Sequence, residues 1–160
     1  MPSNQFLSQD AVGFGYEEDS FFISLANESS ALTGSATQVP AGIMKKNGRI
    51  ANVFIGVGTP AVSASGFVSG TVDAQVKINS AAVLSTLPAI TMVGSAGAAG
   101  RRATNAGGGT SAVVNQASAF ASAGNMISID YNLRSVGSAA ATAAGTGFYV
   151  GVVVRYETTV

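Results

Sequence analysis

The sequence predicts an all-β protein built as an antiparallel β-sandwich. Several segments alternate apolar and polar residues with a period of two, which is typical of half-buried strands. Turns rich in Gly, Ser and Asn separate these segments at short, regular spacing. No window combines a helical period with helix caps. Roughly seven or eight short strands linked in this way indicate two packed sheets.

Two segments, residues 71–78 and 126–133, alternate most regularly. The residues expected in the core are Val72, Ala74, Val76 and Ile78 in the first segment and Ile127, Ile129, Tyr131 and Leu133 in the second. Asp73 and Asp130 alternate with these residues, so both are expected to face solvent. Asn79–Ser80 follows the first segment as a predicted turn, and Gly124–Asn125 precedes the second.

Two other segments are apolar on both faces. In residues 50–57, Ile50 and Phe54 share one predicted face, and Val53, Ile55 and Val57 share the other. In residues 148–154, one predicted face holds Phe148, Val150, Val152 and Val154, and the other holds Tyr149, Gly151 and Val153. Such strands need a cover on both faces, from a second layer of the chain or from another subunit. Residues 20–27 and 37–44 are weaker strand candidates.

The composition favours one domain that associates with other proteins. The chain has 160 residues, enough for a single core. It is 47% hydrophobic and only 10% charged, with a formal net charge of zero. Low charge and low net charge both promote protein–protein contact.

Several function classes are disfavoured by what the sequence lacks. It contains no Cys and no His, which removes disulfides, thiol catalysis, Cys/His zinc sites and His-dependent triads. Its uncharged stretches are rich in Ser, Thr, Gly and Asn, so no membrane span is expected, and no secretory signal is visible at the start. We therefore expect no enzyme activity, no catalytic residue, no cofactor and no metal site.

Charge is unevenly distributed along the chain. Residues 1–30 hold acidic side chains and no Lys or Arg, whereas residues 45–102 are mainly basic. The two regions are expected to attract each other, within a subunit or between subunits. Glu17, Glu18 and Asp19 are consecutive, so their carboxylates point in different directions and do not converge on a calcium ion. A solvated or interface-forming face is the better interpretation.

A glycine-rich stretch, residues 94–112, has the composition of a phosphate-binding loop but lacks the spacing. Gly94, Gly97 and Gly100 lie three residues apart, and no helix follows. Arg101 and Arg102 lack the wide basic field and interleaved aromatics of a nucleic-acid surface. Protein carboxylates are their expected partners, so no nucleic acid is expected. The stretch is predicted to be a long loop between strands.

From residue 39 onward the order of segments resembles a known family. The stretches "VPAGIMKKNGRIANVFIGVGTP", "TVDAQVKINSAAVLSTLPAIT", "VVNQASAFASAGNMISIDYNL" and "GFYVGVVVRYE" resemble successive strands of small jelly-roll domains. Such domains occur in phage capsid decoration (cement) proteins and phage fibre heads. The layout is also similar to the trimeric tumour-necrosis-factor-like sandwich. The resemblance implies a jelly-roll sandwich over residues 39–160, with residues 1–38 as an extended N-terminal arm containing the first strand or strands.

The resemblance also implies a structural function. It suggests a viral capsid decoration protein on the outer surface of the virion, with two partners: itself, as a homotrimer, and the major capsid protein. The alternative is a receptor-binding head of a phage tail or head fibre. Residues 1–38 are a possible capsid-contacting segment. The residues expected at interfaces are Glu17, Glu18, Asp19, Phe54, Arg101, Arg102 and Tyr149.

Overall fold

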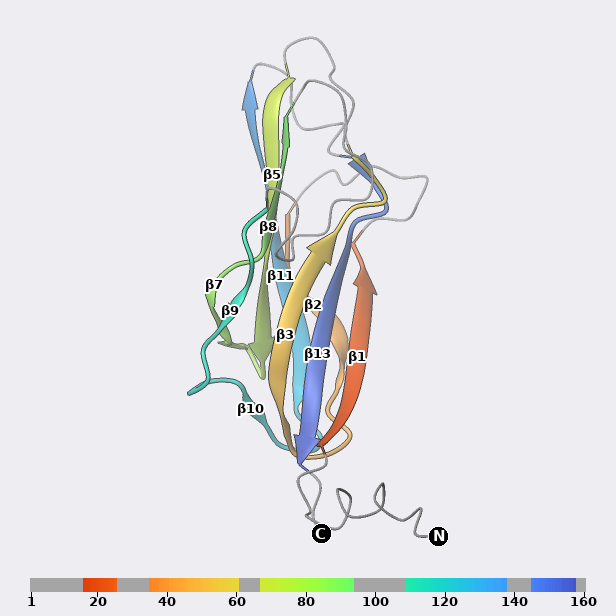
Figure 1. The fold of residues 1–160 in the computed structure, drawn as a ribbon, viewed down its shortest axis with the longest axis vertical. Helices are drawn as coiled ribbons and strands as arrows, with labels where there is room; N and C mark the ends of the chain where they lie inside the picture. Colours follow the sequence, from red (N-terminus) through yellow and green to blue (C-terminus); the bar gives the residue numbers. More distant parts are fainter. Residues whose placement is uncertain (1–15, 26–34, 61–66, 94–108, 138–144, 158–160) are drawn as a thin grey trace, which may run out of the picture.

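The chain folds into two antiparallel sheets packed face to face (Figure 1). The computed structural model describes residues 16–25, 35–60, 67–93, 109–137 and 145–157. Within these ranges all regular structure is β-strand, and there is no helix. The predicted all-β class is therefore confirmed.

The first sheet has four strands in the order β1-β13-β3-β10. These strands are β1 (Tyr16–Ser24), β13 (Tyr149–Glu157), β3 (Gly48–Gly56) and β10 (Phe120–Ala121). The second sheet has the order β2-β11-β5-β6, and β8 also pairs with β5. Its strands are β2 (Ala36–Ile43), β11 (Met126–Gly137), β5 (Phe67–Ile78), β6 (Ala81–Ala82) and β8 (Ala89–Val93). Two short pairs complete the structure: β4 (Thr59–Pro60) with β12 (Gly145–Thr146), and β7 (Leu84–Thr86) with β9 (Val113–Val114).

Along the chain the main strands switch from one sheet to the other, except that β5, β6 and β8 follow one another in the same sheet. β1, β3, β10 and β13 belong to the four-stranded sheet, whereas β2, β5, β6, β8 and β11 belong to the other. This connectivity is that of a jelly roll, in which two interleaved Greek keys form the two sheets. The fold thus agrees with the predicted sandwich type.

The N-terminal boundary differs from the one expected. β1 pairs with β13 over nine consecutive residues, and Ile23 is buried in the core. The predicted boundary between residues 38 and 39 falls inside β2. Residues 16–24 therefore form part of the sandwich, whereas residues 1–15 lie outside the described ranges.

The core lies between the sheets and contains the residues that the alternation predicts. Val72, Ala74, Val76 and Ile78 are buried, as are Ile127 and Ile129, while Tyr131 and Leu133 are partly buried against them. The opposite sheet contributes mainly Val150, Val152, Val154 and Tyr156 from β13 and Ile50, Val53 and Ile55 from β3.

A β-bulge in β3 corrects one predicted face. Val154 pairs with Ile50 and Val153 with Asn52, so Ala51 is an extra residue in the ladder. One extra residue reverses the side on which the preceding residues lie. Ile50 is therefore fully buried on the same face as Val53, not on the face of Phe54. Strict alternation across residues 50–54 was wrong for this reason.

Gly48 in β3 packs directly against the backbone of β13, which leads to a stability prediction. A Cβ at this position would clash with the carbonyl oxygen of Arg155 and lie 3.0 Å from the Cα of Tyr156. Because backbone cannot rotate away, we expect Gly48→Ala to lower the free energy of unfolding by about 1–3 kcal/mol. Chemical denaturation measures this loss. Gly151→Ala is the control: its Cβ would meet the tip of the Phe54 ring, which can move, so a smaller loss is expected. Equal losses would contradict the explanation.

Candidate interaction surface

Two of the predicted interface residues, Phe54 and Tyr149, lie together on the outer face of the four-stranded sheet. Their ring centroids are 6.3 Å apart in an edge-to-face arrangement. Phe22 from β1 joins them, with its centroid 5.7 Å from that of Phe54. Phe22 is 66% exposed, whereas Phe54 and Tyr149 are half-buried. We call these three residues the aromatic patch.

Glycines at matching positions of the ladder make room for the aromatic patch. Gly151 of β13 pairs with Phe22 on one side and with Phe54 on the other, and Gly56 pairs with Tyr149. A Cβ at Gly151 would collide with the Phe54 ring, and a Cβ at Gly56 with the Tyr149 ring. The rings therefore lie over bare backbone, in the way that aromatic side chains cover glycines in neighbouring strands.

A row of charged and aromatic side chains crosses the same outer face beyond the aromatic patch. In register across the four strands lie Phe120, Arg49, Arg155 and Glu18. The guanidinium of Arg49 lies 5.6 Å from the centre of the Phe120 ring, and the Nε of Arg155 donates to Glu18 at 2.6 Å. Like charges opposite each other in a sheet repel, and these two contacts offset that repulsion. The combination of aromatics and Arg is common at the centre of protein interfaces.

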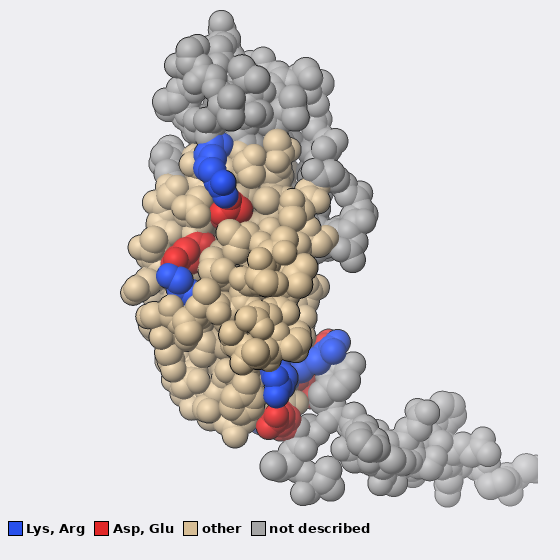
Figure 2. Space-filling view, turned by 90° about the vertical axis from the view of Figure 1, so that its left-hand side faces the viewer, with Lys and Arg blue, Asp and Glu red and all other residues tan. Residues whose placement is uncertain are grey.

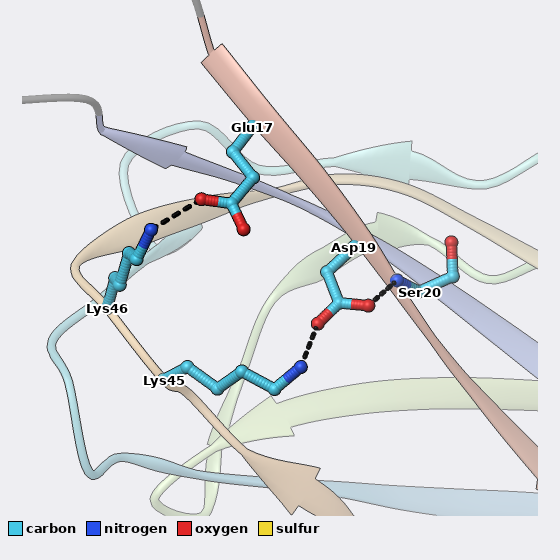
Figure 3. A network of polar contacts seen from close by, with 5 residues as sticks. All are labelled: Glu17, Asp19, Ser20, Lys45 and Lys46. Carbon is cyan, nitrogen blue, oxygen red and sulfur yellow. Dashed lines mark hydrogen bonds and ion pairs between the residues drawn. The ribbon is translucent and has the colours of Figure 1, made fainter.

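The three predicted acidic interface residues are paired within the chain. Lys46 bonds Glu17 at 2.5 Å and Lys45 bonds Asp19 at 2.7 Å, from the turn between β2 and β3 (Figure 3). Glu18 points to the other face of β1, toward Arg155. The side chains of these consecutive acids therefore point in different directions, as predicted. The ion pairs from Lys45 and Lys46 also show that the acidic N-terminal segment and the basic region attract each other within one subunit.

Asp19 has a second role at the edge of β1. Its Oδ1 accepts the backbone N–H of Ser20 at 2.8 Å (Figure 3). The hydrogen bond from Lys45, supported by the N–H of Ser20, lowers the pKa of this carboxyl below its usual range. The bond to Asp19 likewise raises the pKa of Lys45. Both groups are therefore charged near neutral pH.

The outer face of the other sheet is polar and internally paired. Asn132 donates to Asp73 at 3.1 Å, and Arg134 forms an ion pair with the same carboxylate. Asp73 is only 2% exposed, so the expectation that it faces solvent was wrong. It does lie on the outer face, as its alternation predicts, but the partner side chains of β11 enclose it. On the side drawn in Figure 2, charged side chains form small groups of opposite sign on an otherwise uncharged surface.

Asp130 gives this polar face a pH dependence. It accepts the N–H of Gln38 at 2.8 Å and pairs with Lys77 at 2.5 Å. Burial raises the pKa of the Asp130 carboxyl, but the bonds from Lys77 and Gln38 outweigh burial and hold the pKa below its usual range. A carboxyl with a lowered pKa in the folded state stabilises the fold above its unfolded-state pKa. This contribution is lost as the pH falls through the folded-state pKa.

We therefore expect Asp130→Asn to be less stable than the wild type at pH 7, with a difference that shrinks below about pH 4. Denaturation midpoints measured between pH 7 and pH 2 check this. Asp19→Asn is the control, because that pair is exposed and screened by solvent, and a smaller pH-dependent difference is expected. If the difference in stability between the wild type and Asp130→Asn stays constant from pH 7 to pH 2, the lowered pKa of Asp130 is contradicted.

The remaining predicted interface residues, Arg101 and Arg102, lie outside the described ranges. Among the described residues, no group of three metal-ligating side chains is present, and no helix is long and apolar enough to cross a membrane. The sequence interpretation missed Phe22 and Phe120. Phe22 could be found only by pairing residues 16–24 with 149–157, since its place opposite Gly151 depends on that register.

The fold and the surface define a jelly-roll β-sandwich with one aromatic outer face and one polar outer face. No protein-family model, curated protein or solved structure matches the chain. The two faces are therefore the basis on which a function is inferred.

Proposed function

We propose that the chain is a capsid decoration protein that binds the outer surface of a viral particle as a homotrimer and stabilises its lattice. The single observation that supports this most is the aromatic patch. Three rings gather on the outer face of the four-stranded sheet, and the most exposed ring, Phe22, is two-thirds accessible. Large exposed aromatics in a cluster are typical of a surface that another protein covers.

The contrast between the two outer faces supports an orientation of the subunit. The polar face satisfies its own charges through Lys77–Asp130 and Arg134–Asp73, so it needs no partner. The aromatic face carries little charge near the patch. Covering it with another subunit lowers the free energy, because water leaves its apolar surface. The proposed trimer buries the aromatic face between subunits and leaves the polar face outside.

An adhesive function also accounts for the chemistry of the chain. Attachment to a lattice requires many weak contacts repeated by symmetry, and such contacts add through multivalency. It requires no titratable group of the kind that His or Cys supplies. A sequence with 10% charged residues and no net charge suits a subunit whose surface is largely shared with neighbours.

Co-sedimentation tests the proposal. The purified chain is mixed with emptied capsids of the phage that encodes it, and separately with host cells. Saturable binding to capsids, with the bound particles surviving higher temperature, is expected. Binding to cells alone would instead favour the receptor-binding head of a fibre, since exposed aromatic rings also stack on sugars.

A further inference from the structure

The charged side chains of the described residues are almost completely paired within the chain. Among these residues, every Lys, Arg, Asp and Glu except Arg49 and Glu157 belongs to an ion pair with an opposite charge. The pairs are Lys45–Asp19, Lys46–Glu17, Lys77–Asp130, Arg134–Asp73 and Arg155–Glu18. The two side chains left over carry opposite charges.

Both of these charges lie on the outer face that carries the aromatic patch. Arg49 of β3 is opposite Arg155 of β13, and Glu157 lies two residues further along β13. Side chains two residues apart in a strand share a face. Arg49, Arg155 and Glu157 are exposed, whereas Tyr156 between the last two is buried in the core.

Within the chain, the cation of Arg49 is directed away from Glu157. Its Nη1 donates to the carbonyl of Gln116 at 3.2 Å, and its guanidinium lies 5.6 Å from the centre of the Phe120 ring. Phe120 belongs to β10, which pairs with β3 on the side opposite β13. Figure 1 shows β13 lying between β3 and β1. The cation therefore lies toward one side of the face and Glu157 toward the other, and neither of the groups that contact Arg49 carries a charge.

A second copy of the chain supplies the charges that this face requires. Covering a lone charge with another protein is costly unless an opposite charge meets it. In a closed ring of identical subunits, each contact joins two different regions of the surface. The side of the face near β10 offers a cation and the side near the end of β13 offers an anion, so two neighbouring copies are complementary.

We infer that Arg49 of each subunit forms an ion pair with Glu157 of the next subunit around the trimer axis. The inference rests on the proposed function, because it takes as given a trimer that forms through the aromatic face. The aromatic patch supplies the apolar area of the contact, and the ion pair determines the orientation of the neighbouring subunit. An arrangement that places two copies of Arg49 together is disfavoured, since like charges repel.

Mixing two charge-reversed variants tests the inference. Arg49→Glu leaves two acids at these positions, and Glu157→Arg leaves two bases. Each variant alone is expected to need about a tenfold higher concentration to assemble than the wild type. An equal mixture is expected to assemble at lower concentration than either variant alone, because each chain supplies the charge that the other lacks. Light scattering on a dilution series measures the assembly.

Two further variants are the controls. The double variant Arg49→Glu with Glu157→Arg keeps the pair with its signs exchanged and is expected to assemble within about threefold of the wild type. Lys46→Glu makes the same change of charge at an exposed side chain whose partner, Glu17, lies in the same chain. It is expected to assemble like the wild type. Thermal melting of each variant shows that it is folded.

Salt provides a test on the wild type itself, which decides if the reversed variants do not fold. Raising NaCl from about 0.1 M to about 1 M shortens the screening length from about 10 Å to about 3 Å. The wild type is expected to need a severalfold higher concentration to assemble in the higher salt. Assembly that does not weaken would overturn the inference.

The outcomes separate the inference from the proposed function. Recovery of assembly on mixing supports the ion pair between subunits. A trimeric wild type whose assembly is unchanged by the reversals, or reversed variants that do not recover on mixing, overturns the inference and leaves the trimer standing. A wild type that is monomeric at all concentrations overturns both the trimer and the inference.

Discussion

Phe148→Ala is expected to lower the free energy of unfolding by about 3–5 kcal/mol, the usual loss when a buried Phe is truncated. Phe148 is fully buried and immediately precedes β13, and its carbonyl accepts the N–H of Leu25 at 2.8 Å. The ring therefore fills the core where β1 ends and β13 begins. Truncation leaves a cavity that the two paired strands cannot close, because their ladder fixes their separation. Chemical denaturation at a fixed protein concentration measures the loss.

Phe120→Ala is the matched control for this prediction. Phe120 is 40% exposed and contacts the guanidinium of Arg49, so its truncation removes a surface contact and creates no cavity. The expected loss is about 1 kcal/mol or less. A loss for Phe120→Ala as large as that for Phe148→Ala would mean that burial in the sandwich does not determine stability here.

The sandwich was predictable because its strands alternate regularly. In residues 71–78 and 126–133 every second side chain is apolar, and the structure buries or partly buries all of these side chains. The bulge at Ala51 was not predictable, since an extra residue leaves no mark in a segment that is apolar on both faces. The participation of residues 16–24 in the four-stranded sheet depends on pairing with β13, which is distant in sequence.

The candidate surface was predictable only in part for a similar reason. Phe54 and Tyr149 stood out because their strands are apolar on both faces, and the structure brings their rings together. Phe22 joins them only through the register of β1 on β13. The enclosure of Asp73 also depends on cross-strand neighbours, Asn132 and Arg134, which local alternation does not specify. Alternation along the sequence therefore predicts on which face of the sheet a side chain lies. Which side chains surround it on that face depends on how the strands pair, and this is not visible in the local sequence.

Phe22→Ser is expected to convert the proposed trimer into a monomer. Phe22 contributes the most exposed ring of the aromatic patch, so its loss costs the isolated subunit little. At the centre of an interface, truncation of a large aromatic costs about 2 kcal/mol or more for each subunit. Because three equivalent subunits each lose this contact, the effect on trimer formation is multiplied. Light scattering coupled to size-exclusion chromatography measures the mass, which is expected to be three subunits for the wild type and one for the variant.

Ile43→Ser is the control that distinguishes association through the aromatic patch from association driven by any exposed apolar side chain. Ile43 is 62% exposed, close to the value for Phe22, but it lies at the end of β2 in the other sheet. If any exposed apolar side chain drives association, both variants lower the mass. If the aromatic face is the interface, Ile43→Ser retains the trimer and Phe22→Ser does not. A wild-type chain with the mass of a monomer at all concentrations would refute the trimer directly. In that case the aromatic patch would have to contact the particle itself.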